Sequence, residues 1–227
     1  MIGQTSTKPR KRGPRDADNH RIATLYTNQL RRFGTTARAV GWRSRDRQEI
    51  RFATLAKIGV RQGDSVLDVG CGTGDLCDWL SKRGLRVRYV GLDMVPAMIK
   101  HCQTRYPGHN FVLGDLGDPA LSRKEDAVDW VLASGLFAHR KEDPFPDMLA
   151  LVAKMYRICR KGVAFNSLSS AHCPEEADQW ELFHADPDQT LLACEAIARQ
   201  SQPSGRCRLL SGYVEDDFTI HMLKGGK

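Results

Sequence analysis

Long apolar runs and paired cysteines are absent from this sequence of 227 residues. No stretch approaches the roughly 20 apolar residues that a membrane-spanning helix requires, and the N-terminus lacks the apolar centre of a signal peptide. The seven cysteines are an odd number, scattered without a C-x-x-C pair, which disfavours a disulfide framework or a zinc site. These absences predict a cytoplasmic protein in a reducing compartment, with no metal site.

Motifs that bind nucleotide phosphates are missing as well. Neither G-x-G-x-x-G nor G-x-x-x-x-G-K-[ST] occurs anywhere in the chain. A loop that cradles a phosphate or pyrophosphate is therefore disfavoured.

Positive charge is concentrated near the N-terminus. Residues 1–60 contain 14 Lys and Arg against 4 Asp and Glu, whereas residues 61–227 contain 20 against 23, which gives the net charge of +7. We expect residues 1–19 to be a disordered basic tail, residues 20–59 a helical lid, and residues 60–227 the main domain. Such a tail attracts nucleic-acid phosphates, so a non-catalytic RNA-binding protein is one hypothesis. Without interleaved aromatics, a solvated tail is the more frequent outcome, which makes a nucleic-acid partner the weaker prediction.

The most informative stretch is S-V-L-D-V-G-C-G-T-G-D-L at residues 65–76. Its β-branched run predicts a buried parallel strand, and glycines at 70, 72 and 74 permit a tight turn into a helix. Asp75 and Asp78 put negative charge where the helix would otherwise hold an anion, so a cationic ligand is compatible. A second predicted strand ends at Asp93, 23 residues after Gly70, a spacing that suits an acid holding both hydroxyls of a ribose. This pattern predicts a nucleoside ligand.

Four segments in this order resemble class I S-adenosylmethionine (SAM)-dependent methyltransferases: V-L-D-V-G-C-G-T-G-D at 66–75, Y-V-G-L-D-M at 89–94, F-V-L-G-D-L at 111–116 and D-W-V-L-A-S-G-L-F at 129–137. The resemblance covers roughly residues 60–170. It implies an α/β fold with a Rossmann-like, seven-stranded, mostly parallel sheet, closed by an antiparallel C-terminal hairpin. Predicted strands at 206–213 and 217–223 supply that hairpin.

The resemblance also implies SAM as the cofactor and a position for each of its parts. Gly70, Cys71 and Gly72 would face the methionine half, and Asp93 the ribose. Met94 would cover one adenine face, Asp115 would bind the adenine amino group, and Ser134 would lie near the sulfonium. The candidate cofactor-binding residues are Trp42, Arg51, Asp68, Gly70, Cys71, Gly72, Asp93, Met94, Asp115, Leu116 and Ser134.

Arg51 belongs to this set because of its position and its chemistry. It lies 19 residues before Gly70, where similar methyltransferases carry an arginine that clamps the methionine carboxylate. A guanidinium fork matches a carboxylate bidentately. Most of the other arginines are expected to be solvated surface charges.

The candidate catalytic residues are Ser134, Asn166 and Tyr26. Ser134 would line the pocket, and Tyr26, on the lid, could offer its ring to a sulfonium. Asn166 follows a predicted strand with a polar exit and could orient a substrate, or it could make an ordinary strand-end backbone bond. His139 could be a general base, although a loop histidine without a catalytic role is the preferred interpretation.

Two reactions of SAM are compatible with these residues. The chain lacks N-P-P-Y and D-P-P-Y, with which amino-nitrogen methylases of nucleic acids hold a base amine, and it lacks paired acids for a catalytic metal. The first hypothesis is therefore methyl transfer to a small molecule, in secondary metabolism. The alternative is cyclisation of SAM itself to azetidine-2-carboxylate and methylthioadenosine, in a closed site whose aromatics, such as Tyr26, Trp42 or Trp180, exclude water.

Overall fold

The computed structural model describes residues 14–118, 127–172 and 182–225. Their strands form one sheet of order β3-β2-β1-β4-β5-β8-β7, and β6 pairs with β5 beside this path. Pairing is parallel from β3 to β5, whereas β8 is antiparallel to both β5 and β7. The strands are β1 (Ser65–Val69), β2 (Arg88–Asp93), β3 (Asn110–Leu113), β4 (Val128–Ala133), β5 (Cys159–Ser169), β6 (His184–Ala185), β7 (Arg206–Leu210) and β8 (Asp217–Leu223).

This topology confirms the predicted Rossmann-like sheet and its antiparallel C-terminal pair. The seven strands of the main path are the predicted ones. The two-residue β6 is an addition that the sequence did not reveal, because its only ladder is a short parallel pairing with the end of β5.

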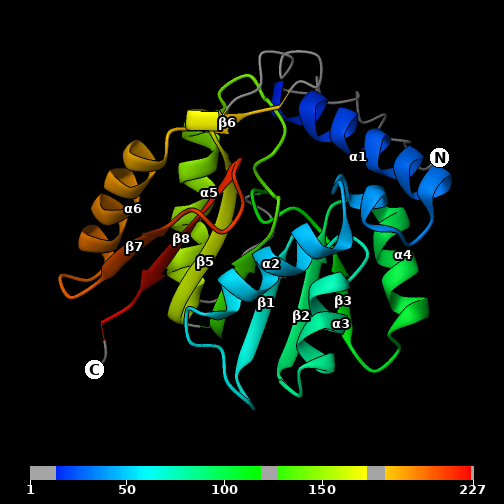
Figure 1. The fold of residues 1–227 in the computed structure, drawn as a ribbon, viewed down its shortest axis with the longest axis horizontal. Helices are drawn as coiled ribbons and strands as arrows, with labels where there is room; N and C mark the ends of the chain where they lie inside the picture. Colours follow the sequence, from blue (N-terminus) through cyan, green and yellow to red (C-terminus); the bar gives the residue numbers. More distant parts are fainter. Residues whose placement is uncertain (1–13, 119–126, 173–181, 226–227) are drawn as a thin grey trace, which may run out of the picture.

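Helices cover the sheet and its upper edge (Figure 1). The α-helices are α1 (Pro14–Phe33), α2 (Arg45–Ala56), α3 (Asp75–Lys82), α4 (Pro96–Arg105), α5 (Pro144–Ile158) and α6 (Pro187–Ser201), and a short 3₁₀ helix, η1 (Ala37–Val40), precedes α2. None of the helices in the described ranges has the length and apolar character needed to cross a membrane.

Alternating strand residues divide the core between the two faces. Leu132 of β4 faces the cluster that contains Leu55 of α2, together with α3 and α4. Its neighbour Val131 faces the other cluster, with Val152 of α5 and with α6. All four side chains are fully buried. Both faces of the central strands are therefore covered, as continuous apolar runs in parallel strands predict.

The first helix begins earlier than expected. Residues 14–19, predicted to belong to the disordered tail, form the first turns of α1. Proline at the first position and Asp16 in the first turn suit a helix start. Asn19 also anchors this end by donating to the Asp115 carboxylate at 2.9 Å. Residues 1–13 of the predicted tail lie outside the described residues.

Gly162 has a structural role inside a strand. Helix α5 ends at Ile158, and β5 begins at Cys159. Gly162 lies inside β5, where a Cβ atom would come within 2.4 Å of the Met222 carbonyl oxygen and 3.1 Å of the Trp130 ring. Close approach of a neighbouring strand requires this glycine.

A buried polar network ties the amino ends of β1 and β4 together. Asp129 accepts hydrogen bonds at 2.8 Å from both the backbone N–H and the hydroxyl of Ser65, and one from Arg160 at 3.2 Å. Burial raises the pKa of Asp129, but the Ser65 bonds and the Arg160 charge outweigh it and hold this pKa well below its usual range.

Asp129→Asn should therefore lower the free energy of unfolding at pH 7 by about 1–3 kcal/mol, because it removes the charge that these donors face. A depressed carboxyl pKa stabilises the fold above the ordinary value of about 4, and that stabilisation is lost as the pH falls through the native pKa. The difference between the two chains should shrink in acid. Urea unfolding at pH 7 and in acid measures it, with the exposed Glu215→Gln as control. A difference independent of pH would contradict this assignment.

Candidate active site

A large pocket opens at the carboxyl ends of β1, β2, β3 and β4, the edge at which open α/β sheets bind ligands. Helix α1 and the segment before α2 close it from above (Figure 1). Most of the predicted site residues line it, namely Tyr26, Trp42, Asp68, Gly70, Cys71, Gly72, Asp93, Met94, Asp115, Leu116 and Ser134. The structure thus brings together residues from six separate parts of the sequence.

The glycine turn after β1 forms the floor of this pocket. Gly70 and Gly72 have φ angles of +76° and +52°, in the left-handed region that favours glycine. A Cβ atom on Gly70 would lie 2.9 Å from Leu136 Cδ1, and one on Gly72 would lie 2.8 Å from Val40 Cγ1. The positive φ angles therefore favour glycine at both positions, and an added side chain would also displace Leu136 or Val40.

Asp93 lies at the end of β2 and connects two turns. Its carboxylate accepts one hydrogen bond from the Gly72 N–H and one from the Val95 N–H, each at 2.8 Å. Burial raises the pKa of Asp93, and the backbone donors oppose this shift. Each oxygen keeps a lone pair with which it can accept a further hydrogen bond from a ligand.

Asp68 lies below the turn and is also buried. It accepts a hydrogen bond from the Tyr89 hydroxyl at 2.5 Å. Burial raises the pKa of Asp68 to about 7, the Tyr89 bond opposes the shift, and the charges of Asp93 and Asp75 add to it. The protonation of this carboxyl group therefore changes near neutral pH.

The opposite wall contains Met94, Asp115 and Leu116. Asp115 follows β3 and accepts a 2.7 Å hydrogen bond from the Gly117 N–H, in addition to the bond from Asn19 on α1. Leu116 is buried. This acid thus connects the first helix to the sheet edge beside the pocket.

Tyr26 and Ser134 face the same pocket from different sides. The Tyr26 hydroxyl lies 3.0 Å from His139 Nε2, and the two rings meet edge to face. Burial raises the pKa of Tyr26, so the phenol stays protonated. The Ser134 hydroxyl is buried and has no hydrogen-bond partner among the described residues.

Two predicted residues lie elsewhere, because neither Arg51 nor Asn166 lines this pocket. Arg51 is only 2% exposed and donates to Asp217 at 2.8 Å, to Asp216 at 3.4 Å and to the Arg47 carbonyl at 3.0 Å. This buried ion pair occupies the fork that was expected to clamp a cofactor carboxylate. Trp180, the third aromatic named above, lies outside the described residues.

Asn166 makes the strand-end bond that was its alternative interpretation. Its Oδ1 accepts from the Gly135 N–H at 2.8 Å, and its Nδ2 donates to Asp217 at 3.2 Å. The side chain therefore fixes the loop that follows Ser134. It does not line this pocket.

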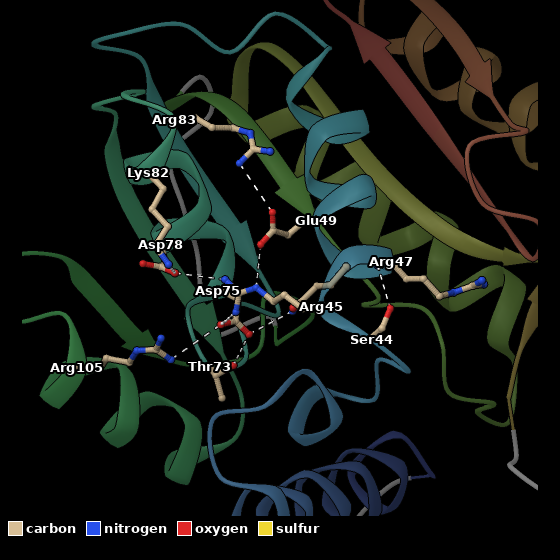
Figure 2. Close-up of polar contacts among 11 residues, drawn as sticks. Ser44, Arg45, Arg47, Glu49, Thr73, Asp75, Asp78, Lys82, Arg83 and Arg105 are labelled. Carbon is tan, nitrogen blue, oxygen red and sulfur yellow. Dashed lines mark hydrogen bonds and ion pairs between the residues drawn. The ribbon is translucent and has the colours of Figure 1, made fainter.

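Arg45, at the start of α2, contacts the acids of α3 that follow the glycine turn (Figure 2). Its guanidinium lies 3.1 Å from Asp75, 3.3 Å from Asp78 and 3.1 Å from Glu49. The buried Asp75 carboxylate also accepts a hydrogen bond from the Thr73 hydroxyl at 2.8 Å. Helix α2 is thereby attached to the first turn of α3.

Several pocket residues were not predicted. Asn19 was assigned to the tail, and Lys141, Asp147 and Lys154 were not singled out. Asp147 and Lys154 are seven residues apart on α5, so both lie on one helix face. This spacing could have indicated a shared face, but solvated surface pairs have the same spacing.

Comparisons with known proteins agree with this geometry. Residues 66–162 match the family described as a methyltransferase domain. A Mycobacterium tuberculosis protein named as a methyltransferase is 28% identical over 167 residues, which are 70% of this chain and 93% of that protein. The malonyl-[acyl-carrier protein] O-methyltransferase of Serratia marcescens is 31% identical over 121 residues, 52% of this chain and 44% of the relative. The chain spans about half the length of the O-methyltransferases of this kind that it matches.

The fold comparison points the same way. The structure of magnesium protoporphyrin IX methyltransferase from Synechocystis with bound S-adenosylhomocysteine (SAH) has a TM-score of 0.65 at 15% identity, covering 93% of this chain and 100% of that one. Residues 66–162 match a methyltransferase domain, and together these similarities support the class I SAM-dependent methyltransferase superfamily that the four sequence segments predicted. SAM is the cofactor of that superfamily.

The pKa of Asp68 predicts how stability changes with pH. Because this pKa is raised from an ordinary value of about 4, the native state holds a proton that the unfolded chain has lost. Asp68 therefore makes the protein less stable as the pH rises from about 4 to beyond 7. In Asp68→Asn, the fall in the free energy of unfolding that this carboxyl group causes between pH 5 and pH 8 should be absent. Urea unfolding at these two pH values measures the fall. An unchanged difference between the two pH values would show that another group causes it.

Proposed function

We propose that this chain is an enzyme that transfers a methyl group from SAM to a small molecule. The observation that carries the proposal is the pocket in which the glycine turn, Asp93 and Asp115 lie together at the ends of parallel strands. Five carboxyl groups and two lysines, Lys141 and Lys154, line it. Asp75 is paired with Arg45 and the pKa of Asp68 is raised, so the negative charge that favours a cationic ligand comes from Asp93, Asp115 and Asp147.

The residues present fit SAM part by part. Gly70 and Gly72 present only backbone to the pocket, so the methionine half can approach this turn closely. The free lone pairs of Asp93 suit the two ribose hydroxyls. Met94 and Leu116 offer apolar contact to the adenine, and Asp115 an acceptor for its amino group. When bound, SAM supplies an electrophilic methyl group on a sulfonium.

The protein's own contribution in this proposal is to hold two reactants in line and to exclude water. Helix α1 covers the pocket with Tyr26, whose ring can attract a sulfonium by cation–π interaction of about 0.5–2 kcal/mol. Fixing donor and acceptor in a reactive geometry can lower a barrier by about 7–11 kcal/mol in favourable systems. No covalent step on the protein is needed.

The pocket residues that are not assigned to the cofactor favour methyl transfer to a separate acceptor over SAM cyclisation. Lys141, Asp147, Lys154 and Phe183 line the same pocket without being assigned to the cofactor, so they can contact part of a second molecule. Cyclisation would need no such residues. The names of two similar proteins, malonyl-[acyl-carrier protein] O-methyltransferase and magnesium protoporphyrin IX methyltransferase, also state an acceptor.

Product analysis separates the two reactions. Purified protein incubated with SAM alone should give no product, and SAH should appear by mass spectrometry only when an acceptor from a small-molecule panel is added. Methylthioadenosine and azetidine-2-carboxylate formed from SAM alone would instead establish cyclisation and overturn the proposal.

Asp93→Ala should weaken the affinity for SAH at least tenfold, because it removes both ribose acceptors and the bond to the Gly72 N–H. Isothermal calorimetry measures this loss. Asp188→Ala, an exposed change in α6, is the matched control and should bind normally. An Asp93→Ala chain that melts like the parent and binds SAH with the parent's affinity would contradict the ribose assignment.

A further inference from the structure

A second cavity lies beside the first, at the carboxyl end of β5. Residues from the segment 41–51, from β5 and from the start of β8 line it. Trp42 and Gly135 line both cavities, so the two spaces meet at these residues. The Trp42 ring lies against the Gly135 backbone, since a Cβ atom there would come within 2.8 Å of Trp42 Cζ2.

Arginine dominates the charge of this second cavity, through Arg43, Arg47 and Arg51. Its two carboxylates are already paired with two of them. Asp217 binds Arg51 at 2.8 Å, and Asp216 binds Arg47 at 2.6 Å. The paired charges cancel, which leaves Arg43 as the surplus cation.

Arg43 is exposed, and its guanidinium has no ion pair or hydrogen bond within the described part of the chain. The Arg47 side chain is 35% exposed and uses one terminal nitrogen on Asp216. Both can therefore donate to a ligand. Arg51 cannot take the same role, because its side chain is 2% exposed and bound to acids, and its guanidinium stacks 4.4 Å from the centre of the Trp42 ring.

The remaining lining suits a ligand with an apolar body. Ala138 and Leu168 contribute apolar surface, and Trp42 contributes a ring edge. A guanidinium fork binds a carboxylate or a phosphate bidentately. The cavity thus offers a cationic end and an apolar wall, next to a pocket whose own charge is acidic.

We propose, on the basis of the proposed function, that Arg43 and Arg47 in this cavity bind an oxyanionic group of the methyl acceptor. This group is a carboxylate or a phosphate. An acceptor anchored there lies against Trp42 and Gly135, the boundary with the donor pocket. The acid-lined pocket repels such an anion, whereas the arginines attract it. The two cavities therefore select different reactants.

Anion titrations of the full chain test this assignment. Benzoate and phenyl phosphate are the probes, and benzamide is the uncharged analogue of benzoate. NMR titrations are recorded with and without SAH, on the parent, on Arg43→Gln and on the exposed control Arg61→Gln. We expect at least one anion to bind the parent and Arg61→Gln, benzamide not to bind, and Arg43→Gln to weaken anion binding about tenfold with SAH affinity unchanged.

The two anions distinguish the source of the charge, since binding of benzoate alone identifies a carboxylate and binding of phenyl phosphate alone a phosphate. Equal anion affinity in Arg43→Gln and the parent would overturn the inference, as would binding of neither anion. Loss of SAH affinity in Arg43→Gln would assign the cavity to the cofactor and overturn it too. If SAH fails to bind the parent, the proposed function fails, and the titrations without SAH still decide whether the cavity binds anions.

Discussion

The hydrogen bond from the Gly72 N–H to the Asp93 carboxylate is the interaction on which the pocket depends. Parallel pairing of β1 with β2 places Val69 opposite Leu92, and the Leu92 carbonyl then accepts from the Gly70 N–H at 2.8 Å. The turn is thus held at Gly70 and Gly72 by the neighbouring strand. Because backbone amides hold Asp93, the acid keeps a fixed position despite a burial that disfavours its charge.

The N-terminal helices are attached to this frame by arginines of α2. Arg45 reaches the first turn of α3 (Figure 2), and Arg51 reaches Asp217 at the start of β8. Exposed ion pairs contribute little to stability, but Asp75 and Asp217 are almost fully buried, so loss of their partners would leave uncompensated charges. Helix α2 therefore spans both cavities in a defined orientation, and Trp42, just before it, lies between them.

The strands, the glycine turn, Asp93 at the end of β2 and Asp115 after β3 could be predicted from local sequence patterns. Each of these features depends on residues within one short segment of the chain. The role of Arg51 could not be read in this way, since its partner lies 166 residues further along the chain. The need for glycine at position 162 could not be read from local sequence either, because the atoms that exclude a side chain there belong to Met222 and Trp130. For Asn166, sequence offered two roles and only the fold chose between them.

The division of charge between the cavities follows from the reaction proposed. Methyl transfer from a sulfonium creates no oxyanion that the protein must stabilise. The charged side chains therefore contribute mainly by binding and orienting the reactants. In this proposal, acids bind the donor and arginines bind the acceptor. If both lined a single cavity, the acids and the arginines would neutralise each other. Trp42 and Gly135 separate them by packed, apolar contact. The arginine expected to bind the cofactor thus contributes to the neighbouring cavity, where it holds Asp217 and supports the Trp42 ring.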